Sequence, residues 1–272
     1  MSARTVTSPD GTRIAISTAG SGPSLVIVGG ALADGSAYAS LATELAPHFT
    51  VYTFDRRARG GSEASGTWSV EREVEDVASV VRACESPVCV YGHSAGAALA
   101  LRAAAAGVPM AQLVLADPPW SPRDVDDAAE RTEHAEQAAE LERLVAAGDL
   151  AGAVRTFLGG FGLSEAEVNE LLATPAGSRL RALARTLPYD YAVLGDGLVP
   201  VAMAAGVSLP TLVLAAASEG VTEDADTHAV TPDAAQQLAQ ALPNARLVRL
   251  DAPVHALAPT DVASTLVTHL AR

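Results

Sequence analysis

The stretch Val90–Gly96, with the sequence VYGHSAG, decides the fold and the chemistry that we expect of this chain. It has the form G-x-S-x-G, and it lies where a predicted strand, Val88–Tyr91, ends and an alanine-rich helix, Ala95–Ala106, begins. A turn of this kind strains the backbone of its central residue, so small residues are needed two positions before and after it. Glycines occupy both places around Ser94. We therefore predict that Ser94 is a nucleophile presented at the end of a strand.

Short apolar runs alternate with longer helical patterns along most of the chain, which predicts an α/β fold with a mostly parallel sheet covered by helices. The first two strands are expected to form a hairpin around a turn at Pro9–Gly11. The expected strands are Arg4–Ser8, Arg13–Thr18, Leu25–Val28, Thr50–Phe54, Val88–Tyr91, Leu113–Ala116, Thr211–Ala215 and Ala245–Leu250. The expected helices of this sheet are Ser36–Leu45, Val70–Cys84, Ala95–Ala106, Asp233–Ala241 and Pro259–Leu270.

The alternation is interrupted between Pro118 and Val207, where the sequence contains no convincing buried strand. This region is rich in helix-forming residues. Four helices are expected in it, at Asp124–Ala147, Leu150–Leu158, Ser164–Ala173 and Gly177–Thr186. We therefore predict a core domain made of residues 1–117 and 208–272, with residues 118–207 inserted as a helical cap.

Composition and charge limit the classes of partner. Of the 272 residues, 49% are apolar, which predicts a packed globule. The 32 acidic residues outnumber the 18 basic ones and give a net charge of −14, which argues against nucleic acid and against an anionic membrane surface. The apolar runs are too short to cross a bilayer, and residues 1–13 lack the apolar core of a signal peptide. Two cysteines, Cys84 and Cys89, form no disulfide framework, so a cytoplasmic location is the default expectation.

A nucleophilic serine needs a base and donors for the oxyanion. His255 lies between the last predicted strand and the last helix, where a loop can bring its imidazole over the strand ends. The backbone N–H of Ala95 follows the nucleophile directly and is one expected oxyanion donor. The second should come from the loop after Leu25–Val28, and we choose Ala31 because two glycines before it let the backbone approach closely.

These motifs together make the chain resemble the α/β-hydrolase superfamily over essentially its whole length. Gly29–Ala31 stands where the family usually has His-Gly-X, so the histidine is replaced. Asp55–Ser62 is similar to the family's D-x-R-G-x-G-x-S turn, with Ala58 in place of a glycine. Pro210–Leu214 and Leu242–Ala245 match the usual flanks of its last strands. The resemblance implies the α/β-hydrolase fold and hydrolase activity, but no particular substrate.

The resemblance leaves two candidates for the acid that orients the histidine. The family usually places this acid shortly after the penultimate strand, and counting from Thr211–Ala215 puts Glu219 there. A second location in the superfamily is the end of the strand after the nucleophile helix, where this chain has Asp117 followed by two prolines. We favour Asp117, because it emerges directly at a strand end, and we keep Glu219 as the alternative.

The predicted reaction is attack of Ser94 on an acyl carbonyl of a small-molecule ester, thioester or lactone, followed by release of the acid by water. The cap should form the substrate pocket, and Trp120 and Phe161 are expected to line it, with Phe157, Tyr189 and Tyr191 as further candidates. No metal or nucleotide motif is present in the sequence, so we expect no cofactor. An acyltransferase or cyclase that uses the same acyl-enzyme and a non-catalytic ligand-binding protein on this scaffold are the alternatives. The substrate and the oligomeric state, monomer or homo-oligomer, stay open.

Overall fold

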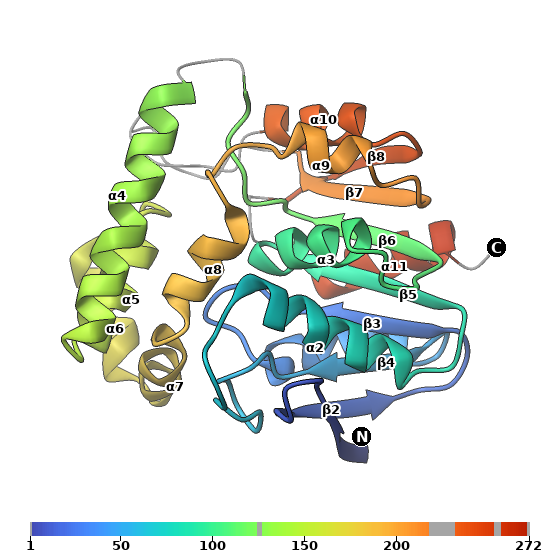
Figure 1. The fold of residues 1–272 in the computed structure, drawn as a ribbon, viewed down its shortest axis with the longest axis horizontal. Coiled ribbons are helices and arrows are strands. Elements are labelled where there is room, and N and C mark those ends of the chain that lie inside the picture. The colour runs from blue at the N-terminus through green and yellow to red at the C-terminus, as the bar shows by residue number, and fades with distance from the viewer. Residues whose placement is uncertain (1, 124–126, 218–231, 253–256, 271–272) are drawn as a thin grey trace.

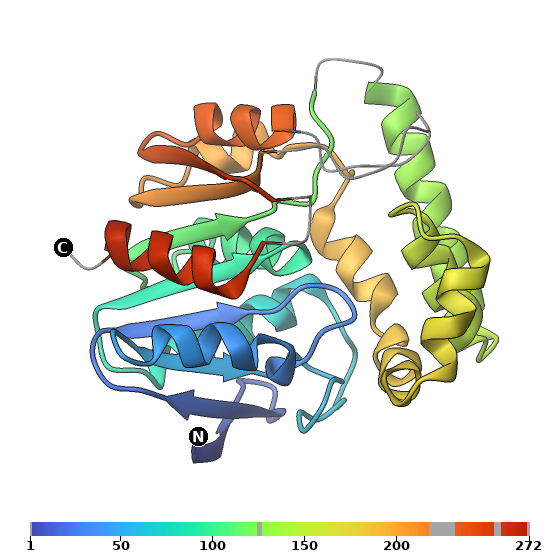
Figure 2. The ribbon, with the colours of Figure 1, turned by 180° about the vertical axis from the view of Figure 1, so that it is seen from behind.

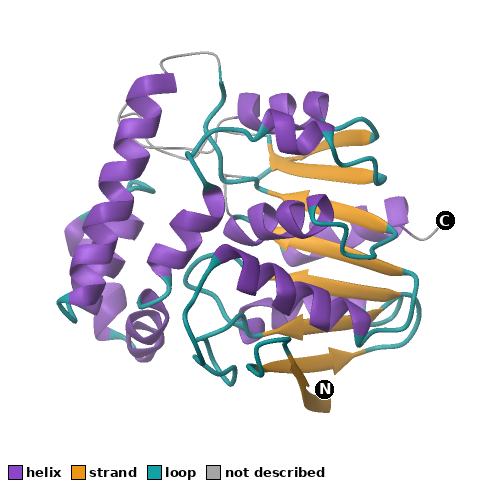
Figure 3. Cartoon of the chain, viewed as in Figure 1, coloured by secondary structure: helices purple, strands orange, loops and turns teal. Residues whose placement is uncertain are grey.

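In the described residues the chain is built around one sheet of eight strands (Figures 1 and 3). The computed structural model describes residues 2–123, 127–217, 232–252 and 257–270. The strands are β1 (Ser2–Thr7), β2 (Arg13–Ala19), β3 (Ser24–Val28), β4 (Thr50–Phe54), β5 (Val88–His93), β6 (Gln112–Ala116), β7 (Thr211–Ala216) and β8 (Ala245–Leu250). They lie in the order β1-β2-β4-β3-β5-β6-β7-β8. Only the pairs β1–β2 and β2–β4 are antiparallel, so the predicted mostly parallel sheet is confirmed.

Helices cover both faces of the sheet, and each face has its own apolar core (Figures 1 and 2). On one face lie α1 (Ala39–Leu45), which follows a 3-10 turn at Gly35–Tyr38, and α11 (Pro259–Leu270). On the other lie α2 (Val70–Arg82), α3 (Ala95–Ala105), α9 (Val201–Ala205) and α10 (Pro232–Ala241). The central strands are therefore buried on both sides, which explains why β3 and β7 are continuous apolar runs.

The parallel register brings the ends of the central strands to one edge of the sheet. Val28 of β3 pairs with Gly92 of β5, and His93 of β5 pairs with Ala116 of β6. The residues that directly follow these strands therefore lie side by side. Because ligands of α/β sheets bind outside the carboxyl ends of the strands, this edge is where a site is expected.

Within the described residues, six helices lie between β6 and β7 in the chain, and the first five of them lie beside this edge (Figure 1). They are α4 (Asp127–Ala146), α5 (Leu150–Gly159), α6 (Glu165–Ala173), α7 (Pro175–Ala184), α8 (Leu187–Leu194) and α9. Buried residues of α4 to α8 form a third apolar cluster, which Ala31 and Leu32 of the sheet edge also contact. Helix α8 packs against both α4 and α3, so it joins this cluster to the sheet.

Two of these helices, α8 and α9, are absent from the sequence prediction. Helix α9 packs against α3 and α10, and Val199 and Ala204 belong to the apolar core that covers the sheet. Ser121 and Leu198 also form an isolated parallel bridge. Residues from both ends of the inserted stretch thus pack on the sheet rather than with the helices beside its edge. None of the helices in the described ranges combines the length and the apolar character needed to cross a bilayer.

Candidate active site

Ser94 is held in a strained turn between β5 and α3. Its backbone has φ of 53° and ψ of −126°, a conformation that residues with a side chain rarely adopt. A Cβ atom at Gly92 would collide with the carbonyl oxygen of Gly96, and a Cβ atom at Gly96 would collide with that of Val28. The Ser94 N–H donates to the carbonyl of Ala116 at 2.9 Å. Gly92 thus allows the close packing of β5 against the start of α3, Gly96 allows the close approach of α3 to β3, and β6 fixes the position of Ser94.

The loop after β3 packs directly against this turn. A Cβ atom added at Gly30 would lie 2.9 Å from the carbonyl oxygen of His93 and 3.2 Å from the Cβ of Ser94. Ala31, the next residue, lines the same cavity as Ser94 and Ala95. Ala95 is the first residue of α3, where backbone N–H groups have no acceptor within the helix. The two predicted donors, Ala31 and Ala95, therefore lie on the same cavity as Ser94.

Tyr38 fills the space beside this loop. Its hydroxyl accepts a hydrogen bond from the N–H of Gly30 at 2.9 Å and lies 3.0 Å from Nδ1 of His93. A Cβ atom at Gly29 would meet the Tyr38 ring at 2.8 Å, so the ring leaves no room for a side chain there. This explains why a glycine replaces the histidine of the family pattern. Burial raises the pKa of Tyr38, so the hydroxyl stays neutral at pH 7.

Asp117 lies at the carboxyl end of β6 and is 1% exposed. Its Oδ1 accepts a hydrogen bond from the N–H of Ala216 at 3.2 Å, and its own N–H donates to the carbonyl of Leu214 at 2.8 Å. Its φ is +43°, so the backbone turns sharply as it leaves the strand. The Oδ2 atom lies 4.0 Å from Nε2 of His93. The carboxylate is thus fixed by β7 on the same sheet edge as Ser94.

The predicted base and the alternative acid, His255 and Glu219, lie outside the described residues. His93, the residue before Ser94, has Nδ1 at 3.0 Å from the Tyr38 hydroxyl and Nε2 at 4.0 Å from Oδ2 of Asp117.

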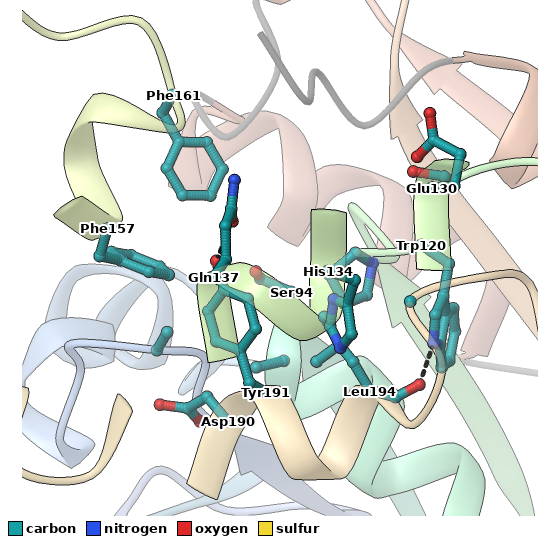
Figure 4. Close-up of a pocket in the computed structure, with 15 residues that line it drawn as sticks. Ser94, Trp120, Glu130, His134, Gln137, Phe157, Phe161, Asp190, Tyr191 and Leu194 are labelled. Carbon is teal, nitrogen blue, oxygen red and sulfur yellow. Dashed lines mark hydrogen bonds between the residues drawn. The ribbon is translucent and has the colours of Figure 1, made fainter. Parts of the chain in front are cut away.

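A cavity of about 740 Å³, part of it open to solvent, lies between the sheet edge and the inserted helices. Figure 4 shows Ser94 among its labelled side chains, with Phe157, Gln137 and Tyr191 on one side and His134 and Trp120 on the other. Four of the five aromatic residues predicted for the pocket line it, namely Trp120, Phe157, Phe161 and Tyr191. The fifth, Tyr189, is stacked on Trp68 instead, with ring centroids 4.2 Å apart.

Helix α4 adds polar side chains to the cavity that the sequence did not single out. They are Glu130, His134 and Gln137, which lie on one face of the helix at spacings of three and four residues. Gln137 accepts a hydrogen bond from the Tyr191 hydroxyl at 2.7 Å, and the His134 ring stacks on Tyr191 with centroids 5.1 Å apart. This spacing was visible in the sequence, but nothing there indicated which face of α4 turns toward Ser94.

The sequence did not predict a cluster of four buried charged side chains behind the loop that follows β3. They are Arg56, Arg59, Glu73 and Asp190. Arg56 pairs with Glu73 and with Asp190 at 2.6 Å each, and Arg59 pairs with Asp190 at 2.7 Å. Each of these side chains is at most 2% exposed. Burial, the largest single influence, would raise the pKa of Glu73. The charge and hydrogen bond of Arg56, the charge of Arg59 and the hydrogen bond from Trp68 together outweigh it and lower the pKa. For Arg59, burial and the neighbouring Arg56 lower the pKa despite the pull of Asp190.

Within the described ranges, no group of three or more His, Cys, Asp or Glu side chains is arranged to hold a metal ion. This edge brings together a strained serine, backbone donors, a buried carboxylate and a mainly apolar cavity with four aromatic side chains. This combination suits nucleophilic chemistry on a neutral carbonyl group.

Comparison with known proteins identifies the family. The profile described as the alpha/beta hydrolase family matches residues 25–265. The crystal structure of an alpha/beta hydrolase from Sphaerobacter thermophilus is 38% identical, with a TM-score of 0.82 over 97% of this chain and 99% of that protein. A hydrolase from Pseudomonas aeruginosa is 22% identical, with a TM-score of 0.71 over 99% of this chain and 98% of its own. An esterase from Rhodococcus sp. is 20% identical, with a TM-score of 0.68 over 100% and 99%. The Pseudomonas and Rhodococcus proteins show only that the fold is shared. The family profile covers most of the sequence and the Sphaerobacter protein is 38% identical, so the chain is a hydrolase that belongs to the alpha/beta hydrolase family.

Proposed function

We propose that this hydrolase cleaves a small-molecule ester, thioester or lactone through an acyl-enzyme on Ser94. The observation that carries the proposal is the backbone of Ser94, with φ of 53° and ψ of −126°, in a turn that faces a cavity. Such strain is retained where the surrounding structure holds it for a purpose. Here it places the hydroxyl at the first turn of α3, where the helix N-terminus favours developing negative charge.

The reaction proceeds in two balanced steps. Ser94 Oγ forms a bond to the acyl carbon while His255 takes the hydroxyl proton, and the leaving group departs with that proton. Water then attacks the acyl carbon and passes a proton to His255. The bond to Ser94 Oγ breaks, His255 returns the proton to that oxygen, and the carboxylic acid is released. The N–H groups of Ala31 and Ala95 hold the oxyanion in both steps.

Asp117 is our proposed partner of His255, with Glu219 as the alternative. In its favour, the Asp117 carboxylate is buried and fixed by the N–H of Ala216 at the same sheet edge as Ser94. An ionised carboxylate held in this way orients an imidazole and stabilises its charged form without taking up the proton.

The inserted residues 118–207 are proposed to act as the cap that selects the acyl group. In support, these residues supply twelve of the fifteen that line the cavity, seven of them from α4, α5 and α8. The wall is mainly apolar, with four aromatic side chains and several polar groups, which is typical of a site for a small organic molecule. The net charge of −14 favours such a substrate over nucleic acid or an anionic membrane. The two unpaired thiols fit a reducing compartment such as the cytoplasm, and burial raises the pKa of each to about 12.

A fluorophosphonate probe tests the assignment, because it reacts with activated serines whatever their natural substrate. We expect labelling of the wild type and none of Ser94→Ala. His255→Gln and Asp117→Asn should slow labelling by about 10³–10⁴-fold, since a triad acts as a unit. The matched variant Glu219→Gln should label at a rate within about threefold of the wild type. If instead Glu219→Gln labels slowly and Asp117→Asn labels normally, Glu219 is the acid that orients His255. Labelling that persists in Ser94→Ala would overturn the proposal.

A further inference from the structure

The four buried charged residues Arg56, Arg59, Glu73 and Asp190, here called the loop-side cluster, lie directly behind the loop that carries Ala31. Arg59 donates from Nη1 to the carbonyl of Gly30 at 2.7 Å and to that of Ala33 at 3.1 Å. Arg56 donates from Nη1 to the carbonyl of Gly29 at 3.3 Å. The two guanidinium groups thus bind the loop through its backbone carbonyls.

The bond from Arg59 to Gly30 determines where the N–H of Ala31 points. The Gly30 carbonyl and the Ala31 N–H belong to the same peptide group, which is planar and trans. Their bonds therefore point in opposite directions, so a guanidinium that fixes the carbonyl from behind also fixes the N–H on the cavity side. Accepting a charged hydrogen bond at the carbonyl polarises the peptide and strengthens its N–H as a donor.

We propose that Arg59, held in place by Asp190, is the positioning residue that aims the Ala31 N–H at the oxyanion. This inference rests on the proposed function, because it takes Ala31 as an oxyanion donor. Asp190 belongs to α8, whose next residue, Tyr191, lines the cavity. The inserted helices and the oxyanion loop are therefore joined through one carboxylate.

The bonding within the cluster argues against a purely stabilising role. Both arginines bind the same oxygen of Asp190, Oδ1. Within the described residues, Arg56 Nη2, Arg59 Nε and Asp190 Oδ2 are buried with no hydrogen-bond partner. Taking four charges out of water is costly, and ion pairs repay that cost only when their remaining atoms are satisfied. The arrangement leaves these three atoms without hydrogen bonds, but it fixes the carbonyls of Gly29 and Gly30, which belong to two consecutive peptide groups beside Ser94.

The chain offers a matched control for this role. Arg57 is also buried, at 3% exposure, and forms a two-point ion pair with Asp76 at 2.6 and 2.7 Å. Its other bonds go to Asp10 and to the carbonyl of Arg72, so it makes no bond to the loop at 29–31. Replacing Arg57 therefore removes a buried guanidinium and an ion pair without touching the oxyanion loop.

The test measures fluorophosphonate labelling of Ser94 as a function of probe concentration, because the phosphoryl oxygen takes the oxyanion position during the reaction. For Arg59→Met we expect the maximal labelling rate to fall about 10- to 100-fold, with the half-saturating concentration changed less than threefold. Arg57→Met should lower the melting temperature but keep the maximal rate within about threefold. Arg59→Lys, whose single ammonium can still reach the Gly30 carbonyl, should recover part of the rate.

Asp190→Asn keeps the shape of the side chain and should also lower the maximal labelling rate. This second variant replaces Arg59→Met in the test if Arg59→Met does not fold. Folded Arg59→Met and Asp190→Asn proteins that label like the wild type would overturn this inference while leaving Ser94 as the nucleophile. Equal losses in Arg57→Met and Arg59→Met would show that general destabilisation is the cause, and would overturn it too. Failure of the wild type to label would instead overturn the proposed function.

Discussion

At the scale of single residues, the backbone of Ser94 has a conformation that glycine adopts more easily than serine. A side chain at such a position costs about 1–3 kcal/mol of strain. Glycine removes this strain, but it also gives the unfolded chain about 0.4–1 kcal/mol more freedom to lose. We expect Ser94→Gly to exceed Ser94→Ala in free energy of unfolding by about 1 kcal/mol, measured by urea titration. Because both variants lack the hydroxyl, their difference reports the backbone strain less the added freedom of the unfolded chain.

The control for this comparison is a glycine in an ordinary helix. Ala135 is exposed on α4, and Ala135→Gly should lower the free energy of unfolding by about 1 kcal/mol. Opposite signs at the two positions would locate the strain at Ser94. A Ser94→Gly protein less stable than Ser94→Ala would show that the turn stores no strain.

Single residues also mark how far the sequence could predict the site. Ser94 could be predicted from the sequence, because the tight turn needs small residues at two nearby positions, and Gly92 and Gly96 occupy them. The contact between Arg56 and Asp190 joins residues 134 positions apart, and no local pattern announces it. Arg56 and Arg59 occupy unspecified positions of the family turn, so the resemblance gave no reason to single them out. Their role depends on the packing of α8, which the sequence did not predict.

At the scale of elements, the strands of the sheet were predicted closely. The central ones, such as β3 and β7, are buried throughout and are nearly uninterrupted apolar runs in the sequence. Thr50–Phe54 and Ala245–Leu250 have the predicted bounds, and β5 extends two residues further to His93. Helix α8 was not predicted from the sequence. Its eight residues include a proline in the first turn and no polar face that would mark an amphipathic helix. Proline is tolerated there, since the first N–H groups of a helix have no acceptor within it.

The turn between β1 and β2 gives a pH-dependent prediction at this scale. Partial burial raises the pKa of Asp10, but hydrogen bonds from Thr12 and Arg57 outweigh it and lower the pKa to about 2. Because the pKa is lower in the folded state than the unfolded value of 3.8, ionised Asp10 stabilises the fold above about pH 4. This stabilisation is lost as the pH falls from about 4 to about 2.

We expect Asp10→Asn to lower the free energy of unfolding by about 1–2 kcal/mol at pH 7, allowing for the partial exposure of the carboxylate. The deficit should shrink steadily as urea titrations are repeated at lower pH down to about 3. Glu85→Gln, at an exposed position after α2, is the matched control and should show no such trend. A deficit for Asp10→Asn that stays constant with pH would mean that the carboxylate charge is not what stabilises the turn.

At the scale of the whole molecule, the net charge of −14 should make the fold sensitive to salt. Like charges repel one another more in the compact state than in the unfolded chain, and salt screens this repulsion. The exposed ion pairs, such as Arg13–Glu63 and Arg143–Glu140, lose little on screening because each contributes little. The buried pairs around Arg56 and Arg57 are shielded from salt.

The balance therefore predicts that salt stabilises this protein at pH 7. Raising the sodium chloride concentration from about 0.01 to 0.15 M shortens the screening length from about 30 to 8 Å. Relief of about 1 kcal/mol of repulsion would raise the melting temperature by about 2–4 °C, as measured by differential scanning fluorimetry. Near pH 4.7, the isoelectric point of the sequence, the net charge vanishes and the salt effect should vanish with it. A melting temperature that falls with salt at pH 7 would mean that attraction between unlike charges outweighs the net repulsion.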